Sequence, residues 1–117
     1  MDLNAAMDRM LRLAEEGKWD EWAQVFAPGA TVRQNFAPGE RSVDDVVAGS
    51  REMGISVRYE NVRRIVRDGL VVEAHDARLG GREAVVDVAL IVEFDGEGKA
   101  TDVSEYLDSA ALASLMA

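Results

Sequence analysis

A chain of 117 residues is long enough for one domain and too short for two hydrophobic cores, so we expect residues 1–117 to form a single domain. Its 13 basic and 22 acidic residues give a net charge of −9, which disfavours binding to nucleic acids and to anionic membranes. The chain has no cysteine and one histidine, which excludes a thiol nucleophile and a multi-histidine metal cluster. We expect no metal and no cofactor.

The N-terminal residues Met1 to Asn4 lack both the basic segment and the apolar run of a signal peptide. No stretch of the sequence approaches the roughly 20 apolar residues that a membrane-spanning helix needs. These two features favour a cytoplasmic location.

The first part of the sequence predicts two helices. Apolar residues recur at helical spacing from Leu3 to Leu13, and Gly17 is typical of the position just beyond a helix end. A second short helix is expected over 18–27, where the dipeptide Pro28-Gly29 ends it. Because a single glycine separates the two helices, they are expected to form a tight helical hairpin.

Trp19 and Trp22 lie three residues apart on the second predicted helix, so their side chains share one face. Packing in the core is the first interpretation of this pair, and an aromatic wall of a ligand pocket is the second. On the second interpretation Trp22 contacts a bound substrate.

The next segment predicts a strand and a third helix. Residues 30–36 are typical of a short strand. Ser42 is an expected N-cap, because its hydroxyl can accept a hydrogen bond from a free backbone N–H in the first turn. The helix that it begins is expected to run to about Met53 and to end at Gly54.

The second half of the sequence predicts four strands separated by glycine-containing turns. The expected strands cover 55–67, 70–79, 83–94 and 99–108, and Ser109 is the expected cap of a terminal helix through Met116. Helices segregated from an antiparallel sheet indicate an α+β fold.

The strand over 83–94 has one wholly apolar face and one mixed face. Alternation places Val86, Val88 and Leu90 on the first face, which we expect to pack against the helices. Ala89 and Ile91 lie on the second face among charged neighbours. They are either scattered surface hydrophobes, which are common, or residues beneath a second subunit. We favour a homodimer through this outer face.

Glu105 lies on the last predicted strand, on the same face as Val103 and Leu107. Because these two apolar residues should point inward, the carboxyl group of Glu105 should point inward with them. Loss of hydration raises the pKa of such a carboxyl group toward the range used in acid–base catalysis. We therefore take Glu105 as a candidate catalytic residue and Val103 as a candidate substrate contact. The alternative is that Glu105 pairs with an arginine at the sheet edge.

Glu73 and His75 share a face of the strand over 70–79 with Val71 and Leu79, so we expect both to point inward. A histidine beside a carboxylate is suited to proton transfer at neutral pH, which makes both residues candidate catalytic residues. The alternative is one histidine with a structural hydrogen bond. A bulge of one residue would reverse the assignment of faces.

Asn35 follows the early strand, where an inward amide would hold a ligand oxygen or a water molecule. The amide can equally satisfy a loop carbonyl, and the residue pattern by itself favours this second role.

The order of helix, helix, strand, helix and four strands resembles the nuclear transport factor 2 superfamily in its SnoaL-like branch. Residues 98–108, Gly-Lys-Ala-Thr-Asp-Val-Ser-Glu-Tyr-Leu-Asp, are similar to the closing strand of that branch, which often begins Gly-Lys-Ile and finishes Glu-Tyr-Phe-Asp. The resemblance implies a cone, in which N-terminal helices pack on a strongly curved antiparallel sheet around an apolar pocket, commonly as a dimer. Because the superfamily includes isomerases, hydrolases, cyclases and binding modules, it implies a fold more than a function.

Residues 33–38, Arg-Gln-Asn-Phe-Ala-Pro, are similar to the Tyr-Gln-Asn-Met-Pro neighbourhood of limonene epoxide hydrolases. The asparagine of that family helps to hold the nucleophilic water, which implies a substrate-binding role for Asn35. Glu105 falls where the family has its water-activating aspartate. His75 replaces an arginine, and Ala77 replaces the aspartate that acts on the epoxide, which counts against epoxide hydrolysis.

Two functions follow from these observations. The first is a cofactor-free isomerase, cyclase or hydrolase-type enzyme acting on a small apolar, oxygenated molecule. Glu105 would be its acid or base, and Glu73 would orient His75. His75 would be either the partner of Glu105 or the hydrogen-bond donor to an oxyanion. The second is a non-catalytic ligand-binding or interaction module of the same fold. The enzyme requires Glu105 and His75 to face one cavity, which distinguishes the two functions.

Overall fold

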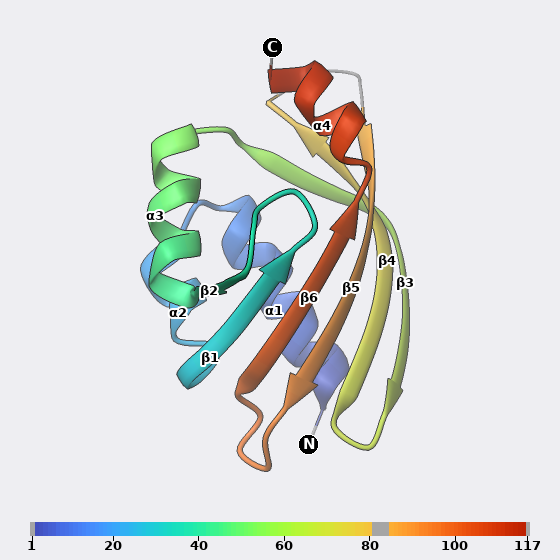
Figure 1. Ribbon diagram of the computed structural model, residues 1–117. Helices are drawn as coiled ribbons and strands as arrows, with labels where there is room; N and C mark the ends of the chain where they lie inside the picture. Colours follow the sequence, from blue (N-terminus) through green and yellow to red (C-terminus); the bar gives the residue numbers. More distant parts are fainter. Residues whose placement is uncertain (1, 81–84, 117) are drawn as a thin grey trace.

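The computed structural model describes residues 2–80 and 85–116, which form an α+β fold with a six-stranded sheet of order β2-β1-β6-β5-β4-β3 (Figure 1). The strands are β1 (Phe26–Gln34), β2 (Glu40–Ser42), β3 (Val57–Arg67), β4 (Leu70–Leu79), β5 (Val85–Phe94) and β6 (Ala100–Leu107). The helices are α1 (Leu3–Glu15), α2 (Trp19–Ala23), α3 (Val43–Met53) and α4 (Ser109–Met116). The start of the strand predicted over 83–94 lies outside the described residues.

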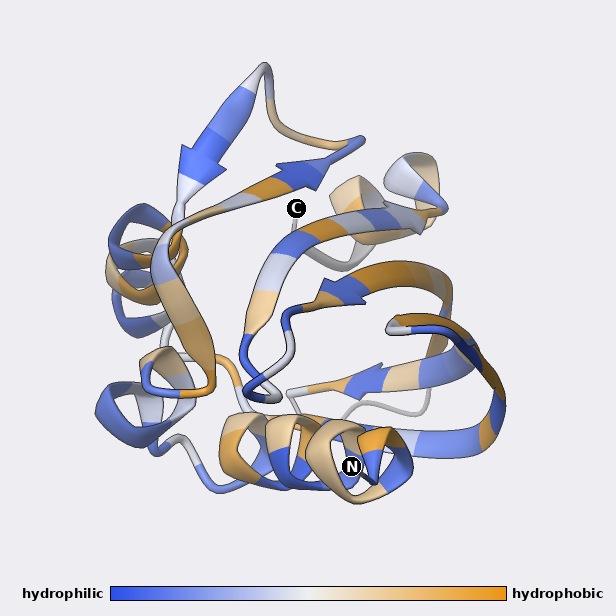
Figure 2. Ribbon diagram, turned by 90° about the horizontal axis from the view of Figure 1, so that it is seen from below, coloured by the Kyte–Doolittle hydropathy of each residue, from blue (hydrophilic) through white to orange (hydrophobic). Residues whose placement is uncertain are grey.

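The N-terminal helices cover one face of the sheet, which we call the inner face, with α1 beside β3 and α3 beside β1 and β2 (Figures 1 and 2). Ser42 caps α3 as predicted, because its Oγ accepts a hydrogen bond from the N–H of Asp45 at 3.1 Å. α4 differs from the prediction, since its cap is Asp108, whose Oδ1 accepts from the N–H of Ala111 at 3.1 Å. In the described part of the chain, no helix is long and apolar enough to cross a membrane.

The second helix is shorter than predicted, and the first strand begins earlier. α2 ends at Ala23, and β1 begins at Phe26, so Pro28 and Gly29 lie within a strand rather than at a helix end. The register between β1 and β6 shifts just after Phe26. Proline is tolerated at such irregularities, because no regular ladder hydrogen bond is required of it there.

The sheet is mixed, whereas the sequence predicts an antiparallel one, because β1 runs parallel to β6. The long connection from β1 through α3 and three strands makes this parallel pairing possible. The sheet is also not strongly curled, contrary to the strongly curved sheet that the resemblance implies. β4 and β5 pair without interruption from Leu70 to Arg78, so no bulge bends the centre of the sheet.

Alternation along β5 follows the prediction. Val86, Val88 and Leu90 are buried on the inner face, whereas Ala89 and Ile91 are exposed on the outer face. The core therefore lies between the inner face of the sheet and the N-terminal helices.

Candidate active site

A cavity of about 540 Å³ lies between the helices and the inner face of the sheet. Most of its lining is apolar, and the polar side chains that the sheet contributes are Gln34, Arg41, Tyr59, His75 and Glu105. In the described residues, no group of three or more His, Asp or Glu side chains is placed to hold a metal ion. The cavity therefore offers acid–base and hydrogen-bonding groups within an apolar wall.

Two carboxylates of the predicted site lie on one row across the sheet. Glu73 on β4 pairs with Leu90 on β5, and Leu90 pairs with Glu105 on β6. Glu105 in turn lies beside Gln34 on β1. Because residues directly opposite one another share a face, Glu73 and Glu105 both point to the inner face, with Leu90 between them. His75 lies on the same face, two residues beyond Glu73, as the sequence predicts.

Glu73 is fully buried, and both of its carboxylate oxygens are occupied. Oε1 accepts a hydrogen bond from Nε of Arg64 at 2.7 Å, and Oε2 lies 2.6 Å from Nδ1 of His75. Arg64 also donates through Nη1 to Asp8 at 2.9 Å and to the carbonyl of Asn4 at 3.0 Å. This buried ion pair ties β3 and β4 to α1.

His75 lines the cavity, but its second ring nitrogen is covered. When Nδ1–H donates to Glu73, the neutral ring keeps its lone pair on Nε2. Nε2 is buried, and it has no hydrogen-bond partner in the described part of the chain. The ring of Tyr59 packs edge-on against the imidazole, with the ring centroids 4.7 Å apart. A positive charge on the ring would lower the pKa of Glu105, so His75 can act on the cavity by its charge but not by a hydrogen bond from Nε2.

Glu105 meets the cavity without a cation directly beside it. Nε2 of Gln34 donates to its Oε1 at 2.9 Å, and Nη1 of Arg41 donates to Oε1 of Gln34 at 2.7 Å. Loss of hydration raises the pKa of Glu105, and the hydrogen bond from Gln34 and the charge of His75 oppose this rise only in part. An arginine is present near Glu105, as the alternative interpretation requires, but the amide of Gln34 separates it from the carboxyl group.

Tyr59 adds a hydrogen-bond donor to the cavity wall. Burial raises the pKa of its hydroxyl group, and the nearby charges of Glu105, Glu15 and Glu73 raise it further. The phenol therefore keeps its proton across the neutral pH range. Its hydroxyl group has no hydrogen-bond partner among the residues that the structure describes.

Aromatic side chains form one wall of the cavity. The ring of Trp22 lies 5.5 Å from that of Trp19 and 4.6 Å from that of Phe26, measured between centroids. All three rings line the cavity, as does Val103 of β6. The structure thus places Trp22 and Val103 on the cavity wall, and their contact with a substrate stays a prediction.

Asn35 is exposed and is not among the residues that line the cavity. Its Nδ2 donates to the carbonyl of Leu107 at 2.9 Å, and its Oδ1 accepts from the N–H of Leu107 at 3.2 Å. The amide therefore extends the pairing of β1 with β6 by one step. This geometry matches the role that the residue pattern favours, in which the amide satisfies the backbone.

Gln34 and Arg41 are polar residues of the site that are not among the residues predicted to form it. Alternation with the buried Val32 indicates that Gln34 points inward, so the sequence holds a signal for Gln34. Arg41 pairs with Val32 and shares its face, but it lies on β2, whose three residues are too few to form a pattern.

Arg64 reaches the inner face because of a bulge in β3. Simple alternation would place Tyr59 and Arg64 on opposite faces, since they are five residues apart. β3 has one extra residue between Glu60 and Arg63, which restores Arg64 to the inner face. Asn61 lies in this segment with a φ of 56°, and asparagine is among the residues that tolerate this conformation best.

Comparisons with known proteins agree with this geometry at the level of the fold. No family model matches the chain, and no curated protein matches it. The structure is similar to that of an NTF2-like protein of unknown function from Cytophaga hutchinsonii, with a TM-score of 0.78 and 10% identity over 97% of this chain and 96% of the other. The chain has the NTF2-like fold.

Two further structures with the NTF2-like fold are named for enzymes. One is a candidate SnoaL-like polyketide cyclase from Shewanella denitrificans, with a TM-score of 0.80 and 9% identity over 97% of this chain and 96% of the other. The other is an LEH-like epoxide hydrolase from M. tuberculosis, with a TM-score of 0.75 and 15% identity over 94% of this chain and 85% of the other. At these identities the likeness shows the fold alone, which confirms the expected NTF2-like fold.

Proposed function

We propose that this protein binds a small apolar, oxygenated molecule in its cavity and acts on it as a cofactor-free isomerase, cyclase or hydrolase-type enzyme. The observation that carries the proposal is the position of Glu105. Its carboxyl group lines an apolar cavity, its pKa is raised by lost hydration, and its direct hydrogen-bond partner is a neutral amide. Such a carboxyl group is suited to accept and return a proton near neutral pH.

The lining residues support proton transfer next to a carbonyl group. Ionised Glu105 takes a proton from the carbon beside the carbonyl, and the electron pair of the broken C–H bond moves onto the carbonyl oxygen. Tyr59, which keeps its proton, donates a hydrogen bond to that oxygen. Protonated Glu105 then returns the proton to another carbon, so the product is an isomer of the substrate. His75, held by Glu73, contributes positive charge near Glu105 when it is protonated.

Exchange of carbon-bound hydrogen in D₂O tests the proposal. With 2-decalone as the probe, wild type should accelerate exchange beside the carbonyl, and Glu105→Gln should lower the rate by about a hundredfold or more. Glu52→Gln is the matched control, because Glu52 also lines the cavity but is exposed. Cyclohexene oxide tests water addition with the same three proteins. Equal rates for wild type and Glu105→Gln in both reactions would contradict a catalytic role for Glu105.

A non-catalytic binding module is the second candidate function, and the burial of Nε2 of His75 favours it, since a covered nitrogen cannot contact a ligand. Both tryptophans of the chain line the cavity, so their fluorescence reports occupancy independently of turnover. Binding of 2-decalone without exchange and without epoxide hydrolysis would favour the binding module.

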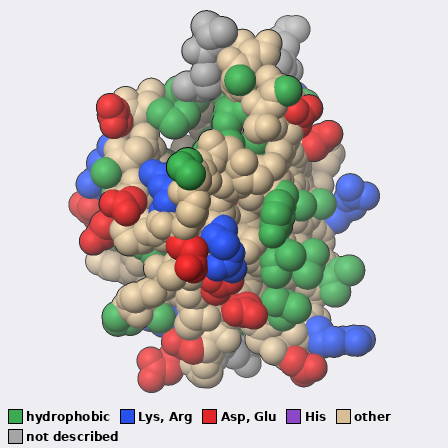
Figure 3. Space-filling model, viewed as in Figure 1, with side chains coloured by type: hydrophobic (Ala, Val, Ile, Leu, Met, Phe, Trp, Pro, Cys, Tyr) green, Lys and Arg blue, Asp and Glu red, His purple; other side chains and the backbone are tan. Residues whose placement is uncertain are grey.

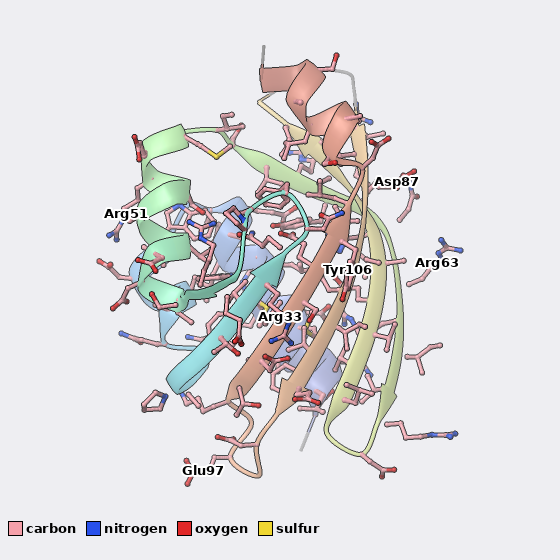
Figure 4. All side chains as sticks on the ribbon, viewed as in Figure 1. Arg33, Arg51, Arg63, Asp87, Glu97 and Tyr106 are labelled. Carbon is pink, nitrogen blue, oxygen red and sulfur yellow. The ribbon has the colours of Figure 1, made fainter. Side chains whose placement is uncertain are left out.

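The outer face of the sheet supports a homodimer. An outer patch of exposed or partly exposed apolar residues covers β3 to β6, and hydrophobic side chains gather on this face in Figure 3. The outer patch consists of Ile65, Val72, Ala74, Ala89, Ile91 and Tyr106. Both signs of charge border it. Arg63 on β3 lies at the other end of the cross-strand row from Tyr106 on β6, and Asp87 lies on β5 (Figure 4). In a contact between two copies of this face, charges of opposite sign can pair across the interface.

Sedimentation at micromolar concentration should therefore show a dimer. Ile91→Lys, at the centre of the outer patch, should raise the dimer dissociation constant at least about tenfold. Ala48→Lys adds the same charge at an exposed position of α3 and should leave the dimer intact. A monomeric wild type would contradict the dimer.

A further inference from the structure

Arg41 is a charged residue of the cavity lining whose hydrogen-bond partners carry no opposite charge. The structure describes three partly buried arginines, Arg41, Arg64 and Arg78. Arg64 pairs with Glu73 and Asp8, and Arg78 pairs with Glu60. Arg41 instead donates to two neutral acceptors, Oε1 of Gln34 at 2.7 Å and the carbonyl of Asp45 at 3.0 Å. A partly buried cation without an anion is unfavourable, and it favours an anion from outside the chain.

The guanidinium group of Arg41 also has more N–H donors than its two hydrogen bonds use. A guanidinium carries five N–H donors, and the two bonds to Gln34 and Asp45 leave three that no described residue accepts. Arg41 lines the cavity on the inner face of β2. Planar, paired N–H groups match the two oxygens of a carboxylate, which makes arginine well suited to bind one.

Gly49 provides the space that the guanidinium group occupies. It lies within α3, where glycine costs about 1 kcal/mol of helix stability relative to alanine. A Cβ atom at this position would lie 3.1 Å from Nη2 of Arg41, which is tighter than ordinary van der Waals contact. Gly49 also lines the cavity. An alanine there would push the guanidinium group of Arg41 aside by a few tenths of an ångström without removing its charge.

We infer that the molecule bound in the cavity carries a carboxylate, which Arg41 holds near Glu105 while the aromatic wall packs against its apolar part. This inference rests on the proposed function of the cavity. Gln34 bridges Arg41 and Glu105 through hydrogen bonds of 2.7 and 2.9 Å, so an anion on Arg41 lies close to the proposed acid–base group. The other carboxylate of the lining, Glu52, is exposed, so solvent and salt screen its repulsion.

A pair of probes of equal length tests the inference. Octanoate and 1-octanol differ in their charged head group, and tryptophan fluorescence reports the binding of either one. At pH 7, wild type should bind octanoate at least about tenfold more tightly than 1-octanol, despite the net charge of −9. Arg41→Gln should abolish this preference by weakening octanoate binding to about the level of 1-octanol binding. Gly49→Ala should reduce the preference while keeping the charge of Arg41.

Arg51→Gln is the matched control, because it removes one positive charge, as Arg41→Gln does, but from α3 instead of β2. Arg51 pairs with Asp20 and points away from the sheet (Figure 4), so its replacement should leave the preference intact. Retained 1-octanol binding shows that a variant is folded. If wild type binds both probes equally, or Arg41→Gln keeps the preference, the carboxylate inference fails and the proposed cavity function stands. If neither probe binds to wild type, the proposed cavity function fails as well.

Discussion

Glu73 and Glu105 lie on one cross-strand row and on one face of the sheet, yet their surroundings differ. Glu73 is fully buried between the side chains of Arg64 and His75, so both of its oxygens have a partner. Glu105 is partly buried at the cavity, and its direct partner is the neutral amide of Gln34. The two residues are of the same type and lie on the same row and the same face. Their surroundings differ because Glu73 has an adjacent cation and Glu105 does not.

The two residues illustrate two roles of a buried carboxyl group, one in stabilising the fold and one in proton transfer. A carboxylate between two partners stabilises the fold and is costly to disturb. A carboxyl group that loses hydration without gaining a cation keeps its proton to higher pH, which costs stability and suits proton transfer. We therefore expect the two ends of the row to respond in opposite ways to substitution.

The largest effect is expected at the Glu73 end. Arg64→Met replaces the guanidinium group with an apolar side chain and leaves Glu73 buried without its cation, which should lower the free energy of unfolding by about 3–5 kcal/mol. Arg63→Met is the neighbouring control on the outer face and should change it by less than about 0.5 kcal/mol. Urea denaturation measures both variants. Adding Glu73→Gln to Arg64→Met should recover part of the lost stability. If Arg64→Met and Arg63→Met were equally stable, Glu73 would not depend on Arg64 as a buried partner.

A smaller effect of opposite sign is expected at the Glu105 end. Glu105→Gln removes a charge that is costly to bury and keeps an oxygen that can accept from Gln34. The free energy of unfolding at pH 7 should rise by about 1 kcal/mol, equivalent to roughly 4 °C in Tm. Glu73→Gln is the matched control and should lose stability, because it removes the buried anion beside Arg64 and leaves only the exposed Asp8.

The gain from Glu105→Gln should depend on pH. Folding raises the pKa of Glu105 above its ordinary value of 4.5, so the folded state binds the proton more tightly than the unfolded state. Wild type therefore gains stability as the pH falls through the raised pKa toward 4.5, whereas the glutamine variant gains nothing from this group. The advantage of the variant should be full above the raised pKa and absent below 4.5. Thermal melts across this range that stay parallel would contradict the raised pKa.

The smallest effect is expected at a pair of carboxyl groups on the outer face. Asp76 and Asp87 lie directly opposite on β4 and β5. A hydrogen bond between them raises the pKa of Asp87, whereas hydrogen bonds from Asn61 and then from Asp87 lower the pKa of Asp76. Asp87→Asn keeps a donor to Asp76 and removes the repulsion, so Tm at pH 7 should rise slightly. The rise should shrink as the pH falls through the raised pKa of Asp87 toward 3.8, because a protonated Asp87 no longer repels Asp76. A drop in Tm at pH 7 would show that the charge of Asp87 has a favourable partner.

Alternation within single strands is sufficient to predict where the proposed acids lie. The inward faces of β4, β5 and β6 follow from their apolar residues, because these strands pair with few interruptions. The inward position of Glu73, His75 and Glu105 is therefore predictable from sequence. The fold is also recognisable from the order of its elements, although the parallel pairing of β1 with β6 is not, since nothing local encodes which strand a distant strand will join.

The partners that distinguish the two carboxylates cannot be predicted from the sequence in the same way. Arg64 depends on a bulge that reverses the alternation of β3, and Arg41 lies on a strand of three residues. The family resemblance points to Asn35 as a residue of the site. Alternation instead places Gln34 on the inner face beside Glu105. Local sequence patterns predict which face of the sheet a residue lies on. The cation and the amide that pair with Glu73 and Glu105 come from other strands, so their positions depend on the tertiary structure.

Titration of the carboxyl carbon of Glu105 by ¹³C NMR tests the difference between the two carboxylates most directly, with the signal assigned from its loss in Glu105→Gln. In wild type the midpoint should lie above 4.5, because lost hydration raises the pKa of Glu105. In His75→Gln the midpoint should move higher still, since the charge of His75 lowers this pKa. A wild-type midpoint at or below 4.5 that His75→Gln does not move would show that Glu105 is an ordinary charged carboxylate with no special aptitude for proton transfer.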